Sequence, residues 1–274
     1  MGNSRNEMKK YLRLFNISFQ QEFAYRLNFI LWRARNVMQI LIFFFLWDAI
    51  FSGGATQIFG YDKAKIFTYA FALIIVRAIV MSSRSADVAG QIANGELSNL
   101  LLKPINYFSY WLTRDLSSKF LNIIFSIFET VVLVLILKPN VFIQTNPVYL
   151  ISFILALIIA MFIYFTTIMM TSFVPFWVPE IAWGAQFLVI VIVVEFLSGA
   201  FLPLDIFPPT AYQILRFTPF PYLVFIPIKI YLGNFDYSMV IQSLLIGTAW
   251  CWVLWRIVNY IWKKGLLVYE GVGR

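Results

Sequence analysis

The chain has 274 residues, of which 61% are hydrophobic and only 12% are charged, and its net charge is +8. Ordinary soluble domains carry about 25% charged residues, so this composition excludes a water-soluble body and indicates a membrane protein, with lipid as its solvent. A single cysteine and no histidine exclude an internal disulfide, a multi-cysteine metal site and histidine-based acid–base catalysis. The Lys and Arg residues lie between apolar runs, which favours a role in membrane topology and disfavours a nucleic-acid partner.

Residues 4–25 come first, with apolar side chains at helical spacing. These are Met8, Tyr11, Leu12, Phe15, Phe19 and Phe23. Basic and glutamine side chains turn away from them, so the segment is predicted to be an amphipathic interfacial helix. It either lies on the membrane surface or packs against the cytoplasmic face of the protein itself, and the sequence leaves both placements open.

Apolar runs follow at about 29–51, 66–82, 108–137, 148–173, 181–201 and 239–262. Each is close to the ~20 residues that a helix needs to cross a bilayer. They predict an all-α integral membrane protein with six transmembrane helices in one domain, residues 1–274, and both termini on one side. The second run is the weakest, because Arg77 interrupts it.

The positive charges predict which side is inside. Sixteen of the 21 Lys and Arg residues lie in the termini and in the connections on the same side as the termini. Cytoplasmic segments carry such an excess, so we expect a multi-pass protein of the cell (inner) membrane with both termini in the cytoplasm.

The connection between the second and third runs contains a short helix of its own. In residues 86–104, Leu97, Leu100 and Leu101 fall on one side of this helix, and Pro104 ends it. A cytoplasmic helix of this kind suits docking of a soluble partner, although a solvated connector is the simpler alternative.

Before the last run, the stretch 202–233 is apolar but cannot be one helix. Six of the chain's 11 prolines lie between positions 203 and 227. Irregular backbone survives at membrane depth only when protein or a water-filled cavity shields it. We therefore expect short external re-entrant helices that close the outer end of a pathway; an apolar flap without a transport role is the alternative.

Three acidic residues lie within or near the apolar runs. Glu129 and Glu195 are candidates to line a pathway, because a buried ionisable group is costly in a membrane. Each could equally be held within the bundle by hydrogen bonds. Asp48 is expected at the outer water interface.

With these segments in place, the sequence resembles the type-2 permease class of ATP-binding-cassette (ABC) transporters, in particular its stand-alone six-span half-permeases. The likeness rests on Gly95-Glu96-Leu97 followed by Leu101-Leu102-Lys103-Pro104, which is similar to the coupling-helix pattern of the family. It rests further on Ser198-Gly199, Leu202-Pro203-Leu204, Phe207-Pro208, Pro219-Phe220 and the stretch from Pro227 to Gly233, which resemble its external re-entrant region. The Pro208-Pro209 pair departs from the single proline expected there.

The resemblance implies the permease subunit of an ATP-driven exporter. Gly95, Glu96, Leu97, Leu101, Leu102, Lys103 and Pro104 would receive the motion of a separate ABC ATPase, and Gly199, Pro203, Pro208 and Pro219 would form the re-entrant gate. A second permease, a copy or a paralogue, would complete the membrane part. ATP and Mg would bind the ATPase, since this chain lacks a Gly-x-x-x-x-Gly-Lys-[Ser/Thr] phosphate loop and is expected to bind no cofactor and to be no enzyme itself.

Two other functions stay open at this point. An ion-coupled secondary transporter or channel would use Glu129 and Glu195 as a relay. A membrane-embedded enzyme would need the same two carboxylates close together, which the sequence does not establish.

Overall fold

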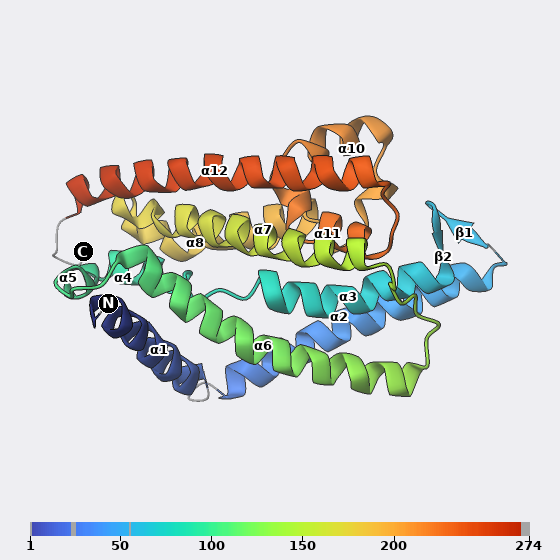
Figure 1. Ribbon diagram of the computed structural model, residues 1–274, viewed down its shortest axis with the longest axis horizontal. Helices are drawn as coiled ribbons and strands as arrows, with labels where there is room; N and C mark the ends of the chain where they lie inside the picture. The colour runs from blue at the N-terminus through green and yellow to red at the C-terminus, as the bar shows by residue number, and fades with distance from the viewer. Residues whose placement is uncertain (1, 23–25, 55, 270–274) are drawn as a thin grey trace.

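The computed structural model describes residues 2–22, 26–54 and 56–269, and it is a bundle of long helices lying side by side (Figure 1). Helix makes up 79% of the described residues. The first helix, α1 (Gly2–Glu22), corresponds to the amphipathic helix predicted over 4–25; the last three predicted positions, including Phe23, lie outside the described residues.

Among the described residues, five helical stretches are long and apolar enough to cross a membrane. They are Arg33–Ser52, Tyr107–Leu137, Pro147–Phe176, Pro179–Leu197 and Tyr237–Val268. Helix α3 (Lys63–Val80) is not among them, because Lys63, Lys65 and Arg77 make it too polar for its 18 residues. The structure therefore agrees with an all-α membrane protein, and the predicted number of six spans is not confirmed by it.

The long helices run up and down the bundle in chain order. They are α2 (Arg26–Ser52), α3, α6 (Tyr107–Leu137), α7 (Pro147–Ser172) and α12 (Tyr237–Val268). We call proximal the end where α1 begins, α12 ends and the short helices α4 (Asp87–Ala93) and α5 (Leu97–Leu101) lie (Figure 1). The opposite, distal end carries the antiparallel pair β1 (Gln57–Ile58) and β2 (Tyr61–Asp62) (Figure 1).

Side-chain caps set the beginning of three of these helices. Asp62 accepts from the Lys65 N–H at the start of α3, Asn106 accepts from the Ser109 N–H at the start of α6, and Asn146 accepts from the Val148 N–H at the start of α7. Such side chains satisfy N–H groups that a helix start leaves unpaired. They explain why each of these three helices begins directly after a polar residue.

Helix α3 ends in the middle of the bundle. Figure 1 shows its last turn well short of the proximal end, with residues 81–86 continuing toward α4 without helix. Most of α3 is buried: Ile66, Tyr69 and Val76 have no exposed surface, and together with Leu223 and Phe225 they belong to the main apolar core.

The fifth predicted run, 181–201, is divided into three joined pieces. They are α8 (Ala182–Gln186), the π-helix η4 (Phe187–Val194) and α9 (Glu195–Leu197). The short 3-10 helices η2 (Val174–Phe176) and η3 (Pro179–Ile181) connect α7 to this unit. A π-helix of eight residues is uncommon, and such stretches are frequent at functional sites.

The stretch 202–233 contains four short helices. They are η5 (Leu204–Ile206), α10 (Pro209–Arg216), η6 (Phe220–Tyr222) and α11 (Phe225–Tyr231). Prolines begin α10 and interrupt helix formation before η6, which is why no single helix forms here. α11 packs on α7 and α3 in the distal half of the bundle, and most of its side chains are buried. The last helix continues to Val268, six residues beyond the predicted end at 262.

Candidate functional site

The segment 86–104, which we call the proximal segment, is built from α4, a turn and α5. Gly95 has a φ of +76°, a backbone conformation that glycine adopts at little cost, and it separates the two helices. Leu97 and Leu100 point into a second apolar core with Trp111, whereas Leu101 and Leu102 are 45% and 86% exposed. Leu97, Leu100 and Leu101 lie on one short helix, α5, where the first two are buried and Leu101 is partly exposed.

Of the residues predicted to contact an ATPase, the structure places only some at the surface. Glu96, Leu101, Leu102, Lys103 and Pro104 are exposed, and we call these five residues the proximal patch. Gly95 forms the turn, and Leu97 anchors the segment in the core. A partner could therefore touch the proximal patch directly, while Leu97 holds the patch in position.

Hydrogen bonds connect the proximal segment to three other parts of the bundle. Lys10 Nζ in α1 donates to the Pro104 carbonyl at 3.2 Å, and the Ser98 N–H donates to the Tyr269 hydroxyl after α12 at 3.4 Å. Gln186 Nε2 in α8 donates to the Ala86 carbonyl at 2.8 Å. A displacement of the proximal segment would consequently act on α1, on α8 and on the end of α12.

Aromatic packing strengthens this connection. Tyr107 stacks on Trp262 with ring centroids 4.0 Å apart, and Phe173 lies 5.2 Å from the same tryptophan. Aromatic pairs at such distances contribute about 0.5–1.5 kcal/mol each beyond their buried area. The start of α6, the end of α7 and the end of α12 are thereby held together beside the proximal segment.

Helix α1 packs on the protein with one face and leaves the other exposed. Phe15 and Phe19 both lie about 6 Å from Phe120 of α6, at 6.1 and 6.0 Å between ring centroids. Glu22 binds the Arg84 guanidinium through both carboxylate oxygens, at 2.6 and 2.5 Å. Met8 and Leu12, predicted on the same apolar face as the phenylalanines, are exposed.

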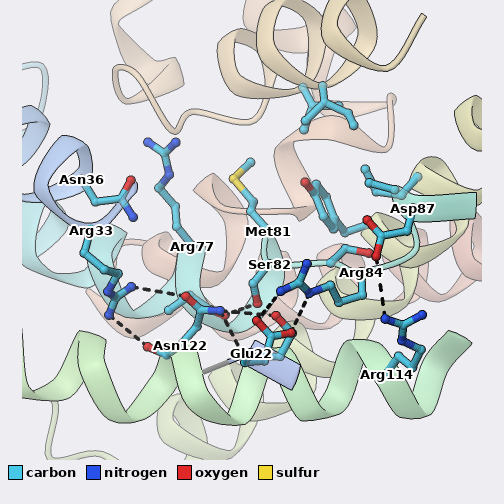
Figure 2. Close-up of a pocket in the computed structure, with 18 of the residues that line it drawn as sticks. Glu22, Arg33, Asn36, Arg77, Met81, Ser82, Arg84, Asp87, Arg114 and Asn122 are labelled. Atoms are coloured by element: carbon cyan, nitrogen blue, oxygen red, sulfur yellow. Dashed lines mark hydrogen bonds and ion pairs between the residues drawn. The ribbon is translucent and has the colours of Figure 1, made fainter. Parts of the chain in front are cut away.

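A cavity of about 1100 Å³ lies between α1, α2, α3, α6, α7 and the α8–α9 unit (Figure 2). Five arginines line it: Arg33, Arg35, Arg77, Arg84 and Arg114. Three carboxylates line it as well: Glu22, Asp87 and Glu195. Figure 2 shows Arg84 directed at Glu22, and Arg114 at Asp87, whose oxygen lies 3.8 Å from Arg114 Nη2. Burial raises the pKa of Asp87 above its ordinary value, against the opposing effect of Arg84 and Arg114.

Both predicted pathway acids form ion pairs in this region. Glu195 Oε1 lies 2.5 Å from Arg77 Nη2 and 3.0 Å from Arg35 Nη2. Glu129 Oε1 lies 2.8 Å from Arg33 Nε, and Glu129 does not line the cavity. The two acids thus meet arginines that lie two positions apart on α2. Glu195 lines the cavity, and Glu129 pairs with a residue that lines it.

Two buried charged residues beside the cavity were missed from the sequence. Asp115 accepts hydrogen bonds from the Arg84 N–H at 2.7 Å and the Ser85 N–H at 2.9 Å. Lys119 Nζ donates to the carbonyls of Val80, at 2.8 Å, and Ser82. The backbone of 81–86 has left the helix, so these side chains supply partners that water would otherwise supply. The signal in the sequence was the i, i+4 spacing of an acid and a base at the start of the third apolar run.

At the distal end, a second polar cluster connects the stretch 202–233 to β2. The Tyr61 hydroxyl donates to Asp205 Oδ2, and Lys229 Nζ donates to the same oxygen at 3.1 Å. We call Tyr61, Asp205 and Lys229 the distal latch. Tyr61 and Lys229 are buried, and burial lowers the pKa of Lys229 below its ordinary value although Asp205 opposes this shift. Asp48, expected at the outer interface, is half-exposed near this end and pairs with Lys63 at 2.8 Å.

The predicted gate residues lie around the turn that leads to this latch. Gly199 has a φ of +81°, and its carbonyl accepts from the Tyr69 hydroxyl at 2.7 Å. Pro203 precedes η5, Pro208 precedes α10 and Pro219 precedes η6. The latch itself was not predicted from the sequence, because its three members are far apart along the chain.

The protein consists of long apolar helices around a cavity lined by charged residues, and its irregular distal backbone packs on other parts of the chain. These features define a multi-pass membrane protein. A comparison with protein families identifies it further: the family described as "ABC-2 family transporter protein" matches residues 37–273. The chain belongs to this family and is a membrane permease of an ABC transporter. Membership implies association with an ABC ATPase subunit. No curated protein matches the chain.

Proposed function

We propose that this permease is an exporter that is driven by a separate ABC ATPase docked on the proximal patch. The observation that carries the proposal is the exposure of Leu102 and Leu101 beside a segment that is otherwise anchored by Leu97 and Leu100. An apolar pair presented on a rigid base is suited to insertion into a pocket of a partner protein. The proposed direction, export, is the one implied by the resemblance of the sequence to the type-2 permeases of ABC transporters.

We propose α3 as the sixth crossing, continued by residues 81–86. Its 18 residues are about 27 Å long at 1.5 Å per residue, close to the ~30 Å of hydrocarbon in a bilayer. The basic residues that make it polar have partners: Lys63 pairs with Asp48, and Arg77 pairs with Glu195. With six crossings, the described ends of the chain share the proximal side. The excess of Lys and Arg in these segments supports a cytoplasmic location for that side.

In the proposed cycle, ATP and Mg bound by the ATPase would alter the position of the proximal segment. The bonds from Pro104 to α1 and from Ser98 to Tyr269 would carry that displacement into the bundle. ATP shifts the equilibrium only if it binds the two states of the complex with different affinity. A second permease, a copy or a paralogue, would complete the pathway, and the stretch 202–233 with its gate residues would close the outer end.

The ion pairs of the two intramembrane acids bear on the alternative of an ion-coupled carrier. An ion-coupled carrier would need the two acids to act together as a relay. Glu129 pairs with Arg33, whereas Glu195 pairs with Arg77 and Arg35, and only Glu195 of the two lines the cavity. This arrangement favours an ATP-driven permease.

Docking is tested by co-purification of the ATPase with a permease in which Leu101 and Leu102 are both replaced by glutamate. Two charges in an apolar contact of this size should abolish co-purification. The control is Ile143→Glu, which changes an exposed apolar residue at the distal end. Undiminished recovery of the ATPase with the double variant, or an equal loss with Ile143→Glu, would contradict docking at the proximal patch.

A further inference from the structure

Helix α1 lies on the outside of the bundle, beside the first half of α6 (Figure 1). Its contact with the bundle includes Phe15 and Phe19, which both pack on Phe120. Outside this contact the helix exposes both apolar and basic side chains, among them Leu12, Ile17, Lys9 and Arg13. Apolar and basic residues together on the free surface of a helix are typical of helices in the surface layer of a membrane.

A shallow groove of about 540 Å³ lies on this free surface of α1. Three bases and three apolar residues line it: Lys9, Lys10, Arg13, Leu14, Ile17 and Ile105. Lys10 has partners, since its Nζ atom lies 2.7 Å from Glu7 Oε2 and donates to the Pro104 carbonyl. Lys9 and Arg13 form no ion pair or hydrogen bond with any residue that the structure describes. The groove therefore carries two positive charges that these residues do not compensate.

The contact with Phe120 sets the depth of α1 in a bilayer. Lys119 is the last charged residue of α6 before this point, and the stretch from Phe120 to Leu137 is about 27 Å long at 1.5 Å per residue. This length is close to the ~30 Å of hydrocarbon in a bilayer, so the hydrocarbon begins near Phe120 on the proximal side. Phe15 and Phe19 consequently lie at the boundary between hydrocarbon and head groups.

The groove changes from apolar to basic along the helix. Leu14 and Ile17 lie within two positions of Phe15, at this boundary. Lys9 and Arg13 lie up to about 9 Å farther toward the proximal end, and the head-group layer on each side of a bilayer is about 5–8 Å thick. Long basic side chains extend readily toward such a layer. The bases are thus near the depth of lipid phosphates, and the apolar residues are near the depth of acyl chains.

We propose that the groove on α1 binds an anionic phospholipid from the leaflet at the proximal end, with its phosphate at Lys9 and Arg13 and its hydrocarbon against Leu14 and Ile17. Both placements that the sequence left open for this helix are then realised, since one face packs on α6 and the other lies on lipid. A soluble partner would not reach Leu14 and Ile17 at this depth. The inference goes beyond the proposed function, because it depends neither on an ATPase nor on the direction of transport.

The test is native mass spectrometry of the full chain in a neutral detergent, without the ATPase. Dilauroyl phosphatidylglycerol is the probe, and dilauroyl phosphatidylcholine has the same hydrocarbon with a zwitterionic head. The first phosphatidylglycerol should bind about 25-fold more tightly, because each of two bases near a membrane surface contributes a factor of about five. Inorganic phosphate at equal concentration should leave the lipid bound, because the hydrocarbon contributes to binding.

Double variants matched in charge locate the site. Lys9→Gln with Arg13→Gln should abolish most of the preference for phosphatidylglycerol. Lys263→Gln with Lys264→Gln removes the same charge from exposed positions near the proximal end of α12 that do not line the groove, and should leave the preference unchanged. Lys9→Arg with Arg13→Lys keeps both charges and should retain the preference, which separates a loss of charge from a loss of fold.

Equal binding of the two lipids, or an equal loss of preference in the two glutamine variants, would overturn the inference. Displacement of the lipid by inorganic phosphate would also overturn it and would identify a site for a free anion. Loss of ATPase co-purification from Lys9→Gln with Arg13→Gln, in neutral detergent without added lipid, would assign the groove to the partner protein instead. A groove that fails to bind lipid leaves docking at the proximal patch standing, and a failed co-purification with the variant of Leu101 and Leu102 leaves lipid binding measurable.

Discussion

Arg77 of α3 and Glu195 of α9 form an ion pair in the cavity wall, with Nη2 of the arginine 2.5 Å from Oε1 of the carboxylate. They are 118 positions apart in the sequence. Through this contact α3 is joined to the end of the π-helical unit, and Arg35 adds α2 to the same carboxylate. Three elements that line the cavity therefore depend on one acidic side chain.

Neutralising Glu195 should destabilise the protein more than neutralising Arg77. Glu195→Gln leaves two neighbouring guanidinium groups without their common carboxylate, and we expect a loss of roughly 2–3 kcal/mol in the free energy of unfolding, less than for a fully buried pair. Arg77→Gln preserves the pair of Arg35 with Glu195 and should cost about 1 kcal/mol. Thermal unfolding in detergent compares the two. A larger loss for Arg77→Gln would show that Arg77 supports the fold through contacts other than Glu195.

The proposed orientation predicts which loops are accessible from outside the cell. In a background in which Cys251 is replaced by alanine, a cysteine at Asn99 of α5 should react with a membrane-impermeant maleimide only after the membrane is opened. A cysteine at Asn140, in the distal connection between α6 and α7, should react in intact cells. Both positions are exposed, so the difference between them reports sidedness. Labelling of position 99 in intact cells would place the proximal patch outside, where no cytoplasmic ATPase could bind it.

Gly199 should tolerate no larger residue at the turn that leads into the predicted gate. An added Cβ would lie 2.8 Å from Phe225 Cβ and 3.0 Å from the Tyr69 hydroxyl, and the φ of +81° adds its own penalty. We expect Gly199→Ala to cost about 2–4 kcal/mol in stability, from overpacking of about 1–3 kcal/mol and a left-handed backbone of about 1 kcal/mol. Gly54→Ala, at a φ of +88° with nothing within 4 Å, isolates the backbone penalty and should cost only about 1 kcal/mol. Equal unfolding temperatures for the two variants would rule out the predicted crowding.

The distal latch should respond more strongly to loss of its acid than to loss of its hydroxyl. Asp205→Asn leaves buried Lys229 without a carboxylate and is expected to cost about 3–5 kcal/mol. Tyr61→Phe removes one hydrogen bond to a charged group and should cost about 1.5–3 kcal/mol. Replacing Asp205 and Lys229 together, by Asn and Met, should recover part of the loss. Denaturation of the three variants tests this order, and no recovery in the double variant would contradict the pairing.

The contact between Tyr269 and α5 should matter for coupling more than for assembly. Tyr269→Ala removes the hydroxyl that accepts from the Ser98 N–H and the ring that packs on Phe176, 5.9 Å away. We expect ATP-driven transport to fall roughly fivefold or more, the size of a modest coupling energy, while the ATPase still co-purifies. Tyr269→Phe keeps the ring but removes the hydrogen bond, so its activity should lie between those of Tyr269→Ala and the unchanged protein. Loss of the ATPase from Tyr269→Ala would mean that the tyrosine supports docking itself.

Much of the fold could be read from local features of the chain. The apolar runs correspond to α2, α3, α6, α7, the α8–α9 unit and α12, and polar caps such as Asn106 and Asn146 lie directly before their helices. The prolines between 203 and 227 likewise predicted several short helices in place of one long one. These features depend on residues that are neighbours in the sequence, so no knowledge of the packing was needed.

The number of spans and the exposed residues of the proximal segment were harder to predict, because both depend on contacts between residues that are distant along the chain. A hydropathy pattern does not show that Asp48 and Glu195 compensate Lys63 and Arg77, and this pairing decides whether α3 is acceptable in a membrane. Leu97 and Leu101 lie on the same short helix, α5, and its pattern does not show which of them meets other parts of the protein. Leu97 packs in the apolar core around Trp111, while Leu101 remains exposed.

By itself, the sequence determined that this is a helical membrane protein, because apolar length and composition decide whether lipid or water solvates a helix. It also carried the short patterns that resemble an ABC permease. Only the tertiary structure decided which charges meet: Glu195 with two arginines, Asp115 and Lys119 with the unwound backbone of 81–86, and Asp205 with Tyr61 and Lys229. These contacts join residues that are distant along the chain, and their energy depends on burial and geometry that arise when the helices pack.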